Sequence, residues 1–155
     1  LSPKAEDNFA LNEVSLLSKG IDSIFSVIDL AGIIIGGFSL LVGGFGIANI
    51  MFVSVKERTN IIGIQKAIGS KNYFILLQFL FEAILLCLIG GILGLLFVYL
   101  GTIWVTNFID FYVTLSIYNI ITGLGASVLI GVVSGILPAL SASRLDPVEA
   151  IRSGQ

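Results

Sequence analysis

The sequence has no histidine and a single cysteine, Cys87, and both shortages narrow its chemistry. Without histidine the chain lacks His-based general acid/base catalysis, the Ser-His and Cys-His pairs of many hydrolases, and His-ligated metal sites. One cysteine cannot form an intrachain disulfide. Cys87 lies inside an apolar run, where a cysteine is typically a small buried hydrophobic residue and not a reactive thiol.

Charge is also scarce. Charged residues make up 12% of the 155 residues and the formal net charge is -2, with no basic run, so nucleic-acid binding is not expected. Hydrophobic residues make up 56% of the chain and the mean hydropathy is +1.05. Soluble domains contain roughly 45–50% apolar and roughly 25% charged residues. This composition therefore predicts a membrane protein.

Long apolar runs are the main feature of the sequence. No charged residue occurs between Asp29 and Lys56, and a helix over that interval is longer than the ~30 Å hydrocarbon core of a bilayer. A second run has Glu82 as its one charge, and a third run has none. The runs are continuously apolar and do not alternate, which favours helices over barrel strands. We expect transmembrane helices at about residues 30–55, 73–100 and 120–140.

The basic residues predict the orientation of these helices. The 56–72 loop holds four of the eight Lys and Arg residues, further arginines follow Leu140, and the 101–118 connector has none. Under the positive-inside rule, the 56–72 loop and the C-terminus are cytoplasmic. Three spans then place Leu1 outside, so we expect a further transmembrane helix upstream of it, together with an extracytoplasmic domain.

Residues 1–29 are expected to form the end of that extracytoplasmic region, and residues 30–155 the transmembrane domain. Residues 11–29 have apolar positions at helical spacing, which predicts an amphipathic helix that runs into the first span. Two interpretations of it remain open: a stalk that leads down from an outer domain, or a helix packed on its neighbours. The apolar positions are Val14, Leu17, Ile21, Ile24 and Ile28.

The 56–72 loop is predicted to contain a short helix. Thr59 or Asn60 is expected to cap its start, Gly69 suits the left-handed residue that ends it, and Ser70 is expected to cap the second span. One side of this helix is apolar and is formed by Ile61, Ile64 and Ile68. Such a helix either docks into a groove on a soluble partner or lies flat among lipid headgroups.

The end of the chain predicts a second short cytoplasmic helix. Pro138 falls near the exit of the third span, where a missing N–H is tolerated. Asp146, Pro147 and Glu149 then have the spacing of an N-cap, a first helical residue and the third residue of a capping box.

Glycines spaced four residues apart are expected to let the membrane helices approach closely. Three such pairs are Gly32 with Gly36, Gly90 with Gly94, and Gly131 with Gly135. Glu82 is the ionisable residue deep in a span, a position that is often functional. We favour a polar contact between Glu82 and a neighbouring helix through Asn49, Gln78 or a serine.

Three stretches resemble the FtsX-like permease domain of MacB-type ABC transporters, which is related to the LolC/LolE lipoprotein-release permeases, and the resemblance covers roughly residues 30–152. The loop VKERTNIIGIQKAIG matches the family's signature at Glu57, Arg58, Thr59, Ile62, Gly63, Ile64, Lys66, Ala67 and Gly69. Residues 138–152 match the family's closing motif, which includes Pro138, Asp146, Pro147 and Glu149. The stretch from Gln78 to Ala83 also fits, including Glu82.

The resemblance implies an all-α integral membrane protein. Family members have four transmembrane helices, so the three spans here would be the second to fourth. They work as dimers with a pair of cytoplasmic ABC ATPase domains, fused or separate, that bind ATP and Mg. Periplasmic adaptor and outer-membrane components are further partners that the resemblance suggests. The 56–69 loop would be the coupling helix that rests on the ATPase.

On this basis the chain is expected to be no enzyme by itself and to hold no cofactor. It is expected to be the permease part of an export or mechanotransmission system in the bacterial inner membrane. An alternative is a regulatory membrane protein that activates cell-wall hydrolases without transporting a substrate. A stand-alone secondary carrier is not favoured, because Glu82 is the one intramembrane charge and no inverted repeat is evident.

Overall fold

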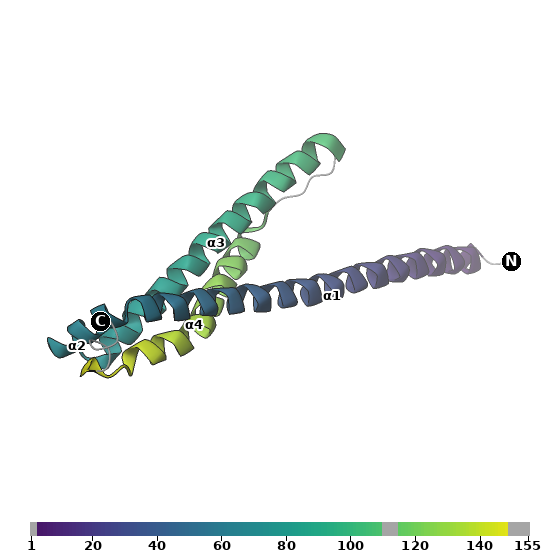
Figure 1. Ribbon diagram of the computed structural model, residues 1–155. Coiled ribbons are helices and arrows are strands. Elements are labelled where there is room, and N and C mark those ends of the chain that lie inside the picture. Colours follow the sequence, from purple (N-terminus) through teal and green to yellow (C-terminus); the bar gives the residue numbers. More distant parts are fainter. Residues whose placement is uncertain (1–2, 110–114, 149–155) are drawn as a thin grey trace. The chain divides into compact units, whose positions relative to one another are not determined.

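The computed structural model describes residues 3–109 and 115–148, with side chains over residues 15–107 and 115–148. These residues form four helices and no strand (Figure 1). The helices are α1 (Pro3–Glu57), α2 (Thr59–Ala67), α3 (Asn72–Ile109) and α4 (Ile117–Ser143). The predicted all-α fold is therefore confirmed.

Three of the helices in the described ranges are long and apolar enough to cross a membrane. Their candidate spans are Ser15–Glu57, Asn72–Asn107 and Ile117–Ser143. Each contains one of the predicted spans. A helix is the expected form for such segments because it satisfies every backbone hydrogen bond within itself.

The chain divides into two compact units, Leu1–Leu41 and Val42–Gln155. In the first unit α1 is continuous, so the helix predicted over residues 11–29 does run into the first span without a break. The described side chains from Leu16 to Leu41 are all exposed. Gly32 and Gly36 face open space, so this predicted glycine pair packs against nothing within the unit. The division predicted at residues 29 and 30 stays a prediction.

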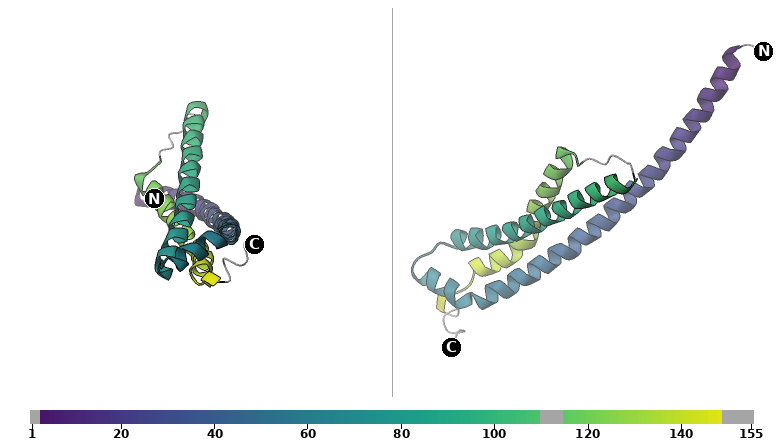
Figure 2. Two further views of the ribbon diagram at one scale, coloured as in Figure 1. Left: turned by 60° about the vertical axis from the view of Figure 1, so that its left-hand side comes forward. Right: turned by 90° about the horizontal axis from the view of Figure 1, so that it is seen from above.

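The second unit has its apolar core at the end where α2 lies (Figure 2). All four helices contribute to this core. The end of α1, the middle of α2, the first three turns of α3 and the end of α4 supply Met51, Val55, Ile62, Ile75, Phe79, Ala83, Ala139 and Ala142, each at most 5% exposed. The short helix α2 is therefore part of the packed body and not a loosely attached loop.

Helices α3 and α4 pack side by side through small residues. A Cβ added to Gly131 would lie 2.8 Å from the Cα of Ile84, and one added to Gly135 would lie 2.5 Å from the Cβ of Ala83. The two backbones thus approach at a distance that only glycine permits. The prediction is confirmed for this glycine pair, whereas Gly90 and its partner four residues later face open space.

Two further close approaches were not predicted. A Cβ on Gly44 of α1 would lie 2.8 Å from the Ser134 hydroxyl, and a Cβ on Gly91 of α3 would collide with Ser127. Both glycines face a serine on α4. Because the sequence does not say which glycines face a neighbour, spacing alone could not select them.

Candidate functional site at the α2 end

Helix α2 ends as its sequence predicts. Gly69 has a φ of +105°, in the left-handed region that favours glycine. Its N–H donates to the carbonyl of Lys66, and the N–H of Ser70 donates to the carbonyl of Gln65, both at 3.0 Å. These bonds satisfy the last carbonyls of α2 and turn the chain towards α3.

The predicted caps are wrong. Arg58 occupies the N-cap position of α2 without a side-chain cap, and both Thr59 and Asn60 lie inside the helix. The hydroxyl of Thr59 instead donates backwards, to the carbonyls of Val55 at 3.1 Å and Lys56 at 2.8 Å. Helix α3 begins at Asn72, two residues after Ser70. The threonine therefore closes the end of α1 rather than opening α2.

The two sides of α2 have opposite environments. Ile62 is 1% exposed within the core, and the adjacent Gly63 is also buried. Ile61, Ile64 and Ile68 are 56%, 47% and 83% exposed. The predicted apolar side thus faces away from the core. We call these three residues the outer isoleucines.

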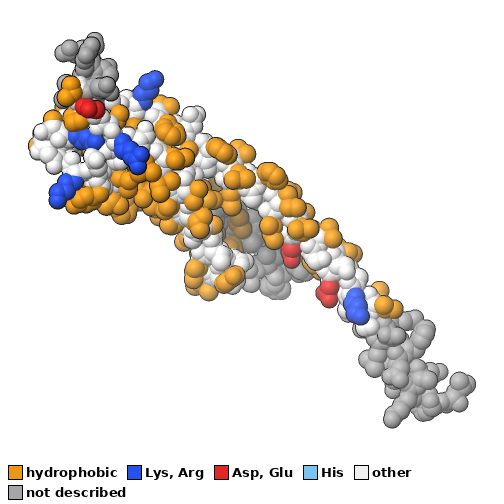
Figure 3. Space-filling view, turned by 90° about the horizontal axis from the view of Figure 1, so that it is seen from below, with side chains coloured by type: hydrophobic (Ala, Val, Ile, Leu, Met, Phe, Trp, Pro, Cys, Tyr) orange, Lys and Arg blue, Asp and Glu red, His pale blue; other side chains and the backbone are white. Residues whose placement is uncertain are grey.

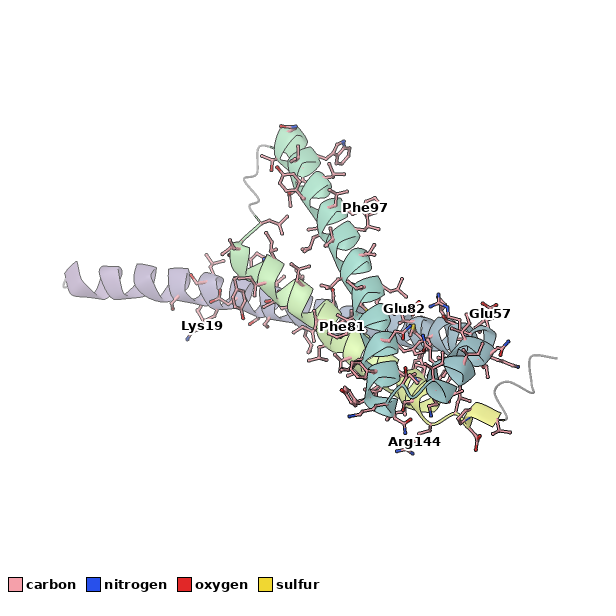
Figure 4. All side chains as sticks on the ribbon, turned by 90° about the vertical axis from the view of Figure 1, so that its left-hand side faces the viewer. Lys19, Glu57, Phe81, Glu82, Phe97 and Arg144 are labelled. Atoms are coloured by element: carbon pink, nitrogen blue, oxygen red, sulfur yellow. The ribbon has the colours of Figure 1, made fainter. Side chains whose placement is uncertain are left out.

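Glu82 pairs with Arg58. The Nη1 of Arg58 lies 3.3 Å from the Oε2 of Glu82, and the two side chains are 49% and 31% exposed. The predicted partners of Glu82, Asn49, Gln78 or a serine, are therefore wrong. Figure 4 labels Glu82 on α3, beside the junction of α1 and α2. The partner of Glu82 lies in the loop that follows α1, so the residues inside the spans do not reveal it.

Lys66 joins α2 to the end of α4. Its Nζ donates to the carbonyl of Leu145 at 2.7 Å, across 79 positions of sequence. Leu145 follows directly after Arg144, the C-cap of α4. A cation at this place also interacts favourably with the negative end of the helix dipole.

The C-terminal motif lies next to this contact. Pro138 is buried inside α4, five residues before the helix ends. The carboxylate of Asp146 accepts a hydrogen bond from the N–H of Val148 at 2.8 Å, and Pro147 and Val148 are helical. The predicted helix start is confirmed this far. Glu149 lies outside the described residues.

Basic side chains of this unit gather at the same end (Figure 3). Lys56, Arg58, Lys71 and Arg144 are exposed, and Lys66 is half-buried. Glu57 and Ala67 of the signature loop are also exposed. The site is thus a short helix whose outer side is apolar and surrounded by basic groups, and whose inner side packs against the three spanning helices. Its arrangement suits docking and transmission of movement.

Comparison with known proteins gives the family of this chain. The family described as FtsX-like permease C-terminal matches residues 33–147. Acinetobacter baylyi has a relative named macrolide export ATP-binding/permease protein MacB, which is 45% identical over 149 residues, covering 94% of this chain and 22% of the relative. A protein of the same name in Rhodopirellula baltica is 38% identical over 144 residues, covering 93% of this chain and 21% of the relative.

A third relative is a Bacillus subtilis protein named uncharacterized ABC transporter permease YknZ. It is 41% identical over 147 residues, covering 95% of this chain and 37% of the relative. The chain thus spans between about a fifth and somewhat over a third of the length of the curated relatives it matches. The family match covers α1 from residue 33 onwards, the signature loop with α2, and both α3 and α4, and the chain belongs to the FtsX-like permease family.

Proposed function

We propose that this chain is the membrane part of a MacB-like ABC export or mechanotransmission system. It couples ATP hydrolysis by a cytoplasmic ATPase to movement of an extracytoplasmic domain. The observation that carries the proposal is the position of α2, whose inner side is buried in a core shared with all three spanning helices while its outer isoleucines are exposed. A displacement of α2 by a partner bound to its outer side is therefore transmitted to all three spanning helices.

The exposed side has the character of a helix that docks into a groove. Isoleucines at positions i, i+3 and i+7 form the anchors that such a groove receives. Three isoleucines with between 47% and 83% exposure are costly to leave in water and gain free energy on docking. The basic groups around them support a cytoplasmic position for this end, in line with the positive-inside rule.

The names of the relatives support the choice of partner. Two are named as ATP-binding/permease proteins, and a third as an ABC transporter permease. On this basis the partner that docks on α2 is an ABC ATPase, fused or separate, which binds the ATP and Mg. A second copy of the permease and an inner-membrane location complete the proposal. The regulatory alternative is not favoured, because these names describe transport.

Site-directed crosslinking tests the docking. In the complete parent protein, made free of other cysteines by changes that include Cys87→Ala, Ile64→Cys is compared with Ile62→Cys. We expect a thiol crosslinker to join position 64 to the ATPase, as identified by mass spectrometry of the joined peptides. Position 62 is the matched control because it faces the core and should not react. Ile61→Cys and Ile68→Cys are tested in the same way. Absence of an ATPase crosslink from all three positions, 61, 64 and 68, would overturn the proposal.

A further inference from the structure

Two polar contacts fasten α2 at its opposite ends to different helices. At its start, the Arg58 guanidinium lies 3.3 Å from the Glu82 carboxylate on α3. Near its last turn, the Lys66 ammonium donates to the Leu145 carbonyl beside the end of α4 at 2.7 Å. Neither contact follows from chain connectivity, since the partners lie 24 and 79 positions apart.

Apolar packing alone would leave α2 free to slide. The contact of Ile62 with the core is apolar and therefore non-directional. It opposes removal of α2 from the core more strongly than it opposes a sliding of α2 over the surface of the other helices. Two charged side chains that form hydrogen bonds at separate points fix both the position and the rotation of α2, because a hydrogen bond requires a particular direction between donor and acceptor. Partly exposed ion pairs add little to stability, so the Arg58–Glu82 pair is better explained by positioning than by folding.

The helices that receive these contacts are themselves locked together. The close backbone approach at Gly131 and Gly135 places α4 directly against Ala83 and Ile84 of α3. Glu82 immediately precedes these two α3 residues. A displacement that reaches α3 through Glu82, or α4 through Leu145, is therefore shared by both helices.

We propose that Arg58 and Lys66 are positioning residues that clamp α2 to α3 and α4, so that the three helices move as one rigid body when the ATPase acts. The inference rests on the proposed function for the source of the movement. The pair of contacts adds a mechanism that docking alone does not supply: the direction of the displacement is preserved between α2 and the two spans.

A distance measurement within one chain tests the clamp. Spin labels are placed at Asn60→Cys on α2 and Phe97→Cys on the outer half of α3, both exposed positions, in the complete transporter with Cys87→Ala. Pulsed electron resonance then compares the nucleotide-free state with the state trapped by ATP and vanadate. With the clamp intact, the distance distribution is the same in both states. A shift on ATP binding in this protein would overturn the inference.

Variants of the clamp give the opposite expectation. Arg58→Glu and Lys66→Gln each allow α2 to move relative to α3, so the distribution shifts or broadens when ATP is bound. The double variant Arg58→Glu with Glu82→Arg restores the ion pair with its charges exchanged. Its distance distribution should therefore again be the same with and without ATP. Lys66→Arg keeps a donor and should behave as the unaltered protein. Lys71→Gln is the matched control, as an exposed lysine of the same segment.

The outcomes separate this inference from the proposed function. Crosslinking from position 64 to the ATPase should persist in every clamp variant, since the outer isoleucines are unchanged. If crosslinking persists while Arg58→Glu and Lys66→Gln show no ATP-dependent shift, the clamp is wrong and the docking stands. Failure of the reversed pair to restore the distribution also counts against the clamp. If cysteines at positions 61, 64 and 68 give no ATPase crosslink while Arg58 and Lys66 are unchanged, the proposed function itself is wrong.

Discussion

Gly135 and Ala83 bring α4 and α3 together so closely that a methyl group on Gly135 would sit 2.5 Å from the Cβ of Ala83. Non-bonded carbons at optimal separation are about 3.5–4.0 Å apart. The two helices must therefore separate or shift to admit any side chain at position 135. This contact lies in the packed end of the unit and sets the spacing between the two helices there.

Gly135→Ala is expected to destabilise the protein by about 1–3 kcal/mol, the usual effect of an extra carbon in a packed interior. Thermal unfolding of the purified protein in detergent measures the change. Gly94→Ala is the matched control, because a Cβ there meets nothing within 4 Å. Equal melting temperatures for the two variants would show that the close approach does not exist in the membrane protein.

Gly69→Ala should weaken the end of α2. Its φ of +105° lies in a region that costs a residue with a Cβ about 1–2 kcal/mol. We expect faster amide hydrogen exchange at Ile68 and Ser70, whose N–H groups bond within this turn. Gly46→Ala serves for comparison, as a glycine in a helix with open space around it. Unchanged exchange at both amides in Gly69→Ala would contradict the turn.

Neighbouring isoleucines of α2 should respond in opposite ways. Ile62→Ala removes a side chain that is 1% exposed and is expected to cost about 2–5 kcal/mol of stability. Ile61→Ala changes an exposed side chain and should leave stability within about 0.5 kcal/mol, while weakening association with the ATPase. Thermal unfolding and co-purification with the ATPase read out the two effects. A larger loss of stability in Ile61→Ala would reverse our assignment of the two sides.

The proposed orientation of the spans predicts a labelling pattern. Lys71→Cys and Ile117→Cys both place a thiol at an exposed position: Lys71 directly precedes α3, and Ile117 is the first residue of α4, after the connector that follows α3. A membrane-impermeant maleimide added to intact cells should label position 117 and spare position 71. Inverted membrane vesicles should give the reverse result. Labelling of position 71 in intact cells would place α2 on the wrong side of the membrane for docking a cytoplasmic ATPase.

Local features of the fold followed from the sequence. The spans were predicted from unbroken apolar runs, and the end of α2 from the one glycine that suits a left-handed residue. The start of α2 was not predicted correctly, because a threonine hydroxyl can bond either to the helix that follows it, as a cap, or to the turn that precedes it. Thr59 bonds to the preceding turn. Sequence favours neither direction when one helix follows another almost directly.

The contacts between helices could not be found in this way. Arg58 and Glu82 come together only because α3 returns past the junction of α1 and α2, and Lys66 meets Leu145 only because α4 ends there. Residue spacing identifies which side of a helix a residue occupies, but not which element covers that side. For the same reason, one of three glycine pairs at identical spacing makes the close contact and the others do not.

The uneven distribution of the core has a consequence for sequence variation. Buried side chains are concentrated near α2, whereas Phe97, Trp104 and most of the described residues in the C-terminal half of α3 are exposed. In a saturation library, nearly every change at Phe79 or Ala83 should abolish function, while most apolar replacements in the C-terminal half of α3 should be tolerated. That segment is therefore the place where related proteins can diverge, or exchange pieces in chimeras, without disturbing the machinery at the other end.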